Sequence, residues 1–156
     1  MYIRVYILSI MKKKYLIDNY GLTSDDQLRK LAIDIGININ YIGFAENIKK
    51  PLTGLNIINL GDHQIGGTHW TSVYVNGKNS FYYDSFAAPP EDILLKYLPK
   101  NVIYNDYFQS QDINEELCGI WALVFLKNMS TLKKNASLNE IFNKFKEFTL
   151  NFKDLN

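Results

Sequence analysis

Two strand-like segments around the pair Asn76-Gly77 limit what this chain can fold into more than any other feature. Residues 70–75 and 80–84 are rich in β-branched and aromatic side chains, and Asn-Gly is the pair most favoured in a two-residue hairpin turn. His69 directly precedes the first segment, and Asp84 ends the second. Antiparallel pairing therefore predicts that this histidine and this carboxylate, far apart in the sequence, become neighbours at the open end of a hairpin.

The segments around this hairpin show both helical and strand patterns. Residues 25–35 predict a helix, because Ser24 and Gln27 form a capping box and Gly36 supplies a left-handed stop. Three more elements are expected before the cysteine: a strand at 55–60, a short helix at 91–98 opened by Pro89-Pro90, and a strand at 101–104.

The segment from Cys118 to Asn128 is almost wholly apolar. Periodicity alone does not separate a helix from a strand here, but the length of the run and its lack of alternation favour a buried helix. A last amphipathic helix is expected to start at Ser137, capped with Glu140, and to place three apolar side chains on one side: Ile141, Phe145 and Phe148.

Composition indicates one globular domain over residues 1–156, with 47% apolar and 21% charged residues. The net charge of +1 gives no general attraction to nucleic acid or to an anionic membrane. We interpret the short lysine clusters as solvated surface, with a weak nucleic-acid contact as the alternative. No apolar run approaches the roughly 18 residues that a membrane span needs.

The N-terminal residues 1–14 are interpreted as a strand or an extension of the domain, and Met11 is an alternative start to Met1. Residues 1–11 are apolar, but Arg4 lies in their middle and lysines follow them. This charge order is wrong for a signal peptide, so we do not expect secretion.

Cys118, the only cysteine, stands at the start of the apolar run. At the N-terminus of a helix, the dipole and the free backbone amides favour an anion, and an imidazolium from His69 would pair with a thiolate. Asp84 would hold the imidazole by its second nitrogen. The amide of Gln111, or of its rival Gln109, and the backbone amide of Cys118 would donate to an oxyanion. These are the parts of a cysteine protease.

Structural interpretations stand beside this one. A lone cysteine before an apolar run is more often a small core residue, and His69 can serve as a hydrogen-bonding residue at a strand start. Asp84-Ser85 can be turn chemistry. The order and spacing of the three residues together favour the catalytic interpretation.

Other side chains near these residues have two interpretations as well. Trp70 is expected to pack in the core and to form, with Gly119, a wall of the site. A zinc site is conceivable from four side chains, Asp62, His63, His69 and Cys118. The chain lacks the ligand spacing that zinc sites show, so we expect no metal.

Three motifs follow one another in the chain: Gly-Gly-Thr-His69-Trp70, then Tyr-Tyr-Asp84-Ser-Phe followed by Pro89-Pro90, and then Gln111 seven residues before Cys118-Gly119. In this order, the motifs resemble those of the adenovirus-type capsid-maturation proteases, which belong with the Ulp1-like deconjugating peptidases. The chain is most similar to the short versions carried by virophages and Polinton-like elements. Residues 31–36 and 41–43 also resemble the start of the adenoviral enzyme, and the similarity spans about residues 24–125.

The resemblance implies a Ulp1/adenain-like α+β fold: a mixed central β-sheet flanked by helices, with the nucleophile at the N-terminus of a buried helix. It implies cleavage of viral capsid or other structural precursors beside glycine, with four catalytic residues: His69, Asp84, Gln111 and Cys118. It also implies action in the virion and in the cytoplasmic virus factory of the host cell.

The chain departs from the family in its activation. The adenoviral enzyme is switched on by a peptide disulfide-bonded to a second cysteine, and this chain has only one. That mode is excluded, whereas activation by a noncovalent peptide or by DNA stays open, although nothing in the chain indicates either. We expect no cofactor. Two rival functions remain: a deconjugating protease for a ubiquitin-like protein, and a non-catalytic capsid- or scaffold-binding module on the same fold.

Overall fold

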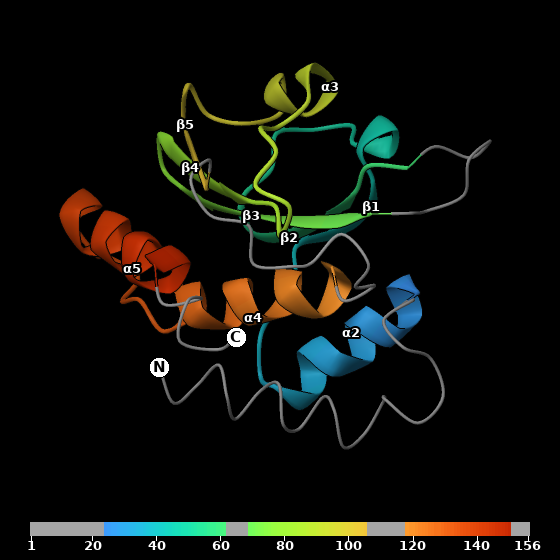
Figure 1. The fold of residues 1–156 in the computed structure, drawn as a ribbon, viewed down its shortest axis with the longest axis horizontal. Helices are drawn as coiled ribbons and strands as arrows, with labels where there is room; N and C mark the ends of the chain where they lie inside the picture. Colours follow the sequence, from blue (N-terminus) through green and yellow to red (C-terminus); the bar gives the residue numbers. More distant parts are fainter. Residues whose placement is uncertain (1–23, 62–68, 106–117, 151–156) are drawn as a thin grey trace.

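The computed structural model describes residues 24–61, 69–105 and 118–150, which form a five-stranded sheet with helices on both faces (Figure 1). In chain order the elements are α2 (Asp25–Asp34), β1 (Tyr41–Phe44), the 3-10 helix η1 (Ala45–Asn47), β2 (Gly54–Asn59), β3 (Trp70–Asn76), β4 (Asn79–Tyr83), α3 (Asp92–Leu95), β5 (Asn101–Tyr104), α4 (Cys118–Ser130) and α5 (Leu138–Leu150). The expected N-terminal extension, 1–14, lies outside the described residues.

The sheet has the order β1-β2-β3-β4-β5. Its three central strands pair antiparallel, whereas β1 pairs parallel to β2 and β5 pairs parallel to β4. The expected α+β architecture, a mixed sheet flanked by helices, is confirmed at this level.

Successive side chains of the strands pack into two hydrophobic cores, one on each face of the sheet. In β4, Phe81 and Tyr83 pack toward the helices on one face, and Tyr82 packs toward the other face. Figure 1 shows α2, α4 and α5 together on the first face and α3 with η1 on the second. Successive side chains of a strand point to opposite faces, so Tyr82 faces away from its neighbours Phe81 and Tyr83.

Helix α4 is buried around almost its whole circumference. All residues from Cys118 to Leu126 are buried, because the sheet covers one side of the helix and α2 and α5 contact it from the other (Figure 1). A helix that is apolar all round is stable only in such surroundings. The predicted buried helix is therefore confirmed over Cys118–Ser130.

The predicted helix ends are also confirmed at several points. Ser24 and Gln27 make both hydrogen bonds of a capping box, and Gly36 has a φ of 76° after the last turn of α2. The hydroxyl oxygen of Ser137 accepts from the backbone N–H of Glu140 at the start of α5. The expected apolar side of α5 is buried as well, through Ile141, Phe145 and Phe148.

The hairpin turn is one residue later than predicted. Asn76 pairs with Asn79, so Gly77 and Lys78 are the two loop residues, and Asn76 belongs to β3. Gly77 has a φ of 58°. A type II′ turn needs this conformation at its first loop position and takes glycine there. The preference of glycine for the first loop position of this turn outweighs the high frequency of Asn-Gly as the loop pair of hairpin turns.

Two further predictions needed correction. The short helix expected at 91–98 covers only Asp92–Leu95, since the chain after it turns so that the carbonyl of Tyr97 accepts from the backbone N–H of Leu52. Strand β1 was not predicted from the pattern, because its four residues show no clean alternation and it is held by parallel pairing with β2.

Candidate active site

The open end of the β3–β4 hairpin brings the predicted histidine and carboxylate together. His69 lies directly before β3, and its carbonyl accepts a 2.9 Å hydrogen bond from the backbone N–H of Leu60. Asp84 lies directly after β4. The ring nitrogen Nε2 of His69 is 2.7 Å from Oδ1 of Asp84.

The two residues are diagonal neighbours rather than direct partners. The observed register pairs Ser72 with Tyr83, so its continuation would place Asp84 beside Thr71. A turn at Asn76-Gly77 would have placed Asp84 directly opposite His69. When the turn shifts by one residue, each residue is paired with a partner two positions away, which lies on the same face of the strand. Diagonal neighbours of this kind remain within reach of long side chains. The predicted contact therefore forms although the predicted turn was wrong.

Asp84 is held as a buried hydrogen-bond acceptor. Only 1% of the residue is exposed, and Oδ1 accepts a 2.8 Å bond from the backbone N–H of Phe86 in addition to its contact with His69. The carboxylate thus fixes one nitrogen of the imidazole and leaves Nδ1 for another partner.

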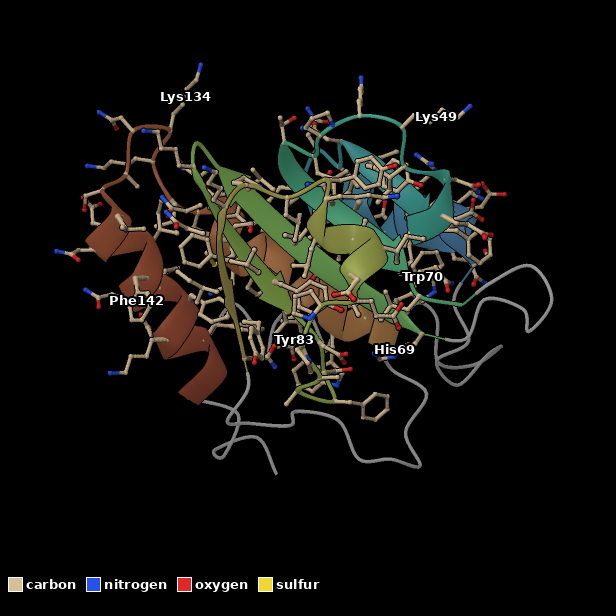
Figure 2. The ribbon with its side chains drawn as sticks, turned by 90° about the horizontal axis from the view of Figure 1, so that it is seen from above. Lys49, His69, Trp70, Tyr83, Lys134 and Phe142 are labelled. Carbon is tan, nitrogen blue, oxygen red and sulfur yellow. The ribbon has the colours of Figure 1, made fainter. Side chains whose placement is uncertain are left out.

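Cys118 is brought to the same place by α4. Its Sγ accepts a hydrogen bond of 3.4 Å from the backbone N–H of Trp70, the residue after the histidine. Figure 2 shows His69 and Trp70 together at one end of the sheet and Lys49 and Lys134 on the side of the molecule away from them. Helix and hairpin therefore meet at the thiol.

Asp84 and Cys118 both act on the charge of the His69 imidazole. Burial acts to lower the pKa of His69, but hydrogen bonds to Asp84 and Cys118, together with their charges, raise it to about 9. At neutral pH the ring is therefore an imidazolium. A protonated ring between a carboxylate and a sulfur is suited to pair with a thiolate and to deliver a proton.

Backbone N–H groups at the start of α4 are the expected donors for an oxyanion. The described part of α4 begins at Cys118, and the first four backbone N–H groups of a helix have no acceptor within the helix. Gly119 is buried beside Cys118. Gln111 and its rival Gln109, the expected side-chain donors, lie outside the described residues.

Trp70 packs in the core, as expected. It is 8% exposed and packs in the same core cluster as Cys118. It also lines a hollow of about 460 Å³ whose other wall includes Tyr41 and Phe44 of β1. Trp70 thus packs in the core and also lines a hollow at the surface, between β1 and β3.

Two residues near the site were missed by the sequence analysis. The ring of Phe86 lies 4.9 Å from the imidazole of His69, centroid to centroid, with a 31° angle between the planes. Asn105, directly after β5, is hydrogen-bonded to the backbone of Asp84. Phe86 stood in the quoted motif as a signal, whereas Asn105 becomes relevant only once β5 is placed beside β4.

Two further classes of site were considered. Within residues 24–61, 69–105 and 118–150, no group of three or more His, Cys, Asp or Glu side chains is arranged so that it could hold a metal ion; Asp62 and His63, named for a zinc site, lie outside these ranges. None of the helices in the described part of the chain has both the length and the apolar character needed to cross a membrane.

Comparison with known proteins does not assign the chain to a family. No family model matches the sequence, and no curated protein matches it. The functional argument therefore rests on the residues and their geometry.

Proposed function

We propose that this protein is a cysteine endopeptidase with Cys118 as nucleophile, His69 as acid and base, and Asp84 as the group that orients His69. The observation that carries the proposal is that three groups meet at one point: the carboxylate of Asp84 is 2.7 Å from the imidazole of His69, and the thiol of Cys118 accepts a bond from the backbone of Trp70, the next residue. A cysteine that only fills the core needs no imidazole beside it and no buried carboxylate behind that imidazole.

The chemistry follows from the charge of the ring. The Cys118 thiolate attacks the carbonyl carbon of the scissile peptide bond, and the electron pair of the C=O bond moves to the oxygen. The free amides at the N-terminus of α4 donate to this oxyanion. As the C–N bond breaks, the His69 imidazolium gives its proton to the leaving amine, and a thioester remains on Cys118.

Hydrolysis of the thioester completes the cycle. Neutral His69 removes a proton from a water molecule, whose oxygen attacks the thioester carbonyl. The C–S bond breaks, the carboxylic acid product leaves, and the thiolate and the imidazolium are restored. Asp84 keeps one nitrogen of the ring fixed through both half-reactions.

We extend the proposal to substrate on the basis of the motif resemblance. The order His69, Asp84 and Cys118, with a tryptophan after the histidine and a glycine after the cysteine, is that of the adenovirus-type capsid-maturation proteases. We accordingly infer that the natural substrates are viral structural precursors cut at glycine-containing sites.

Two assays test the two levels of this proposal. A peptide vinyl sulfone ending in Gly-Gly should add covalently to the wild-type protein, with the mass increase located on Cys118, and should not add to Cys118→Ala. Absence of labelling of the wild type would leave the non-catalytic binding module as the better description.

The second assay separates the substrates. The protein is incubated with capsid precursor polypeptides and, in parallel, with a ubiquitin-like protein fused through its Gly-Gly end to a reporter, and new termini are mapped. Cleavage of the precursors beside glycine supports maturation. Cleavage of the fusion alone would favour the deconjugating protease.

A further inference from the structure

Asn105 holds the backbone of Asp84 at both of its polar groups. The side-chain oxygen Oδ1 of Asn105 accepts a 3.0 Å hydrogen bond from the Asp84 N–H, and Nδ2 of Asn105 donates a 2.7 Å bond to the Asp84 carbonyl. Asn105 is fully buried, with 0% of its surface exposed. The bonds are therefore sheltered from competition with water.

The position of Asn105 explains why a side chain performs this task. Strands β4 and β5 pair in parallel up to Tyr82 and Tyr104. A continued register would set Asn105 beside Tyr83, one residue short of Asp84. The amide of Asn105 has one acceptor and one donor, as a peptide group has, so it extends the ladder by one residue beyond the last strand pair.

Asp84 needs such an anchor because the chain turns there. The next residues form a tight turn, in which the Asp84 carbonyl also accepts a 2.8 Å bond from Ala87, a non-glycine residue with a φ of 61°. Left-handed backbone is unfavourable at an alanine and persists only where surrounding contacts fix it. Movement of the Asp84 backbone would carry the carboxylate away from His69.

We propose that Asn105 is a positioning residue for the Asp84–His69 pair, acting by clamping the backbone of Asp84 at the end of β4. Its part in turnover rests on the proposed function; its part in holding the carboxylate against the imidazole does not. The β4–β5 ladder is complete without the Asn105 side chain, so the clamp is directed at Asp84 rather than at strand pairing.

Two variants separate the hydrogen bonds from the space that the side chain fills. Asn105→Ala removes both bonds and leaves a cavity, whereas Asn105→Leu removes both bonds and fills a similar volume. The matched control is Asn101→Ala at the start of β5, which removes an exposed side-chain bond to Asn79 of β4.

The first readout is the titration of the imidazole, followed by NMR, which requires no enzyme activity. The chain has two histidines, His63 and His69, so His63 supplies an internal reference. In both Asn105 variants we expect the pKa of His69 to fall from about 9 toward its ordinary value of about 6.5. Asn101→Ala should leave the titration unchanged.

The second readout is turnover of a glycine-containing peptide. We expect both Asn105 variants to lose about 10²-fold in kcat with little change in KM, because a displaced catalytic pair affects the chemical step more than binding. If the wild-type protein does not cleave the peptide, that result counts against the proposed function alone, because the titration still tests the clamp.

Three results would overturn the inference. One is a His69 titration in both variants that matches the wild type. Another is recovery of wild-type pKa and kcat in Asn105→Leu but not in Asn105→Ala, which would assign Asn105 to packing. The last is loss of folding in both variants, seen by circular dichroism, which would make Asn105 a requirement of the fold.

Discussion

At its turn the β3–β4 hairpin is closed by two exposed residues, Gly77 and Lys78, whereas at its open end His69 and Asp84 are enclosed by groups from several elements. The conformation of the turn depends on its own residues, chiefly the positive φ of Gly77. The open end depends on Cys118 from α4, on Phe86 from the following turn and on Asn105 after β5. One end of the hairpin is thus specified locally, and the other is assembled by the rest of the fold.

This comparison predicts that changes at the open end affect turnover far more than stability, and that changes at the turn do the reverse. The largest effect is expected for Cys118→Ala. We expect turnover to fall by roughly 10⁴–10⁶-fold, as for removal of a nucleophile from other hydrolases, while the thermal midpoint changes little. Steady-state kinetics measure the loss of turnover, and thermal unfolding measures the stability of the variant. Substantial unfolding of Cys118→Ala would identify Cys118 as a core residue instead.

The next effect in size is expected for Asp84→Asn. The neutral amide removes the charge that helps to raise the pKa of His69, so the imidazolium is less stable and its orientation is lost. We expect kcat to fall by about 10²–10⁴-fold and the alkaline limit of activity to move to lower pH. Unchanged kinetics would remove Asp84 from the proposed triad.

The pH dependence of the wild type should follow His69. Since its folded pKa of about 9 lies above the ordinary 6.5, we expect kcat/KM to decline above pH 9, by about tenfold per pH unit. The stability contributed by the charged ring is fully present below pH 6.5 and is lost as pH rises through about 9. A flat profile of activity across pH 8–10 would contradict this assignment; denaturant unfolding at the same pH values measures the stability.

The smallest effect is expected at the turn. In Gly77→Ala the added Cβ meets no atom within 4 Å, so only the strain of a left-handed alanine remains, about 1–2 kcal/mol of unfolding free energy. Turnover per folded molecule should be unchanged, and Lys78→Ala is the matched control with an expected effect below about 0.5 kcal/mol. A large loss of kcat in Gly77→Ala would mean that the two ends of the hairpin are coupled.

Much of the fold could be read from local patterns. The capping boxes at Ser24 and Ser137 fixed two helix starts, and the apolar run from Cys118 predicted the buried helix α4. The contact of His69 with Asp84 also followed, because a two-residue turn at either position leaves both residues on the same face of the hairpin.

The parallel pairs could not be read in this way. Strands β1 and β5 pair through long connections, so nothing local indicates that β5 lies beside β4 or that Asn105 reaches Asp84. The same holds for the approach of Cys118 to Trp70 and His69, which depends on how α4 packs against the sheet.

By itself, therefore, the sequence determined the identities of the reactive groups, the face that His69 and Asp84 share, and the helix that begins at Cys118. Only the tertiary structure decided the meeting of the thiol with the His69 end of the hairpin and the Asn105 clamp. The physical reason is range. Capping, turn conformation and strand alternation act over a few residues, whereas the placement of α4 and β5 is set by the burial of apolar surface that distant segments share.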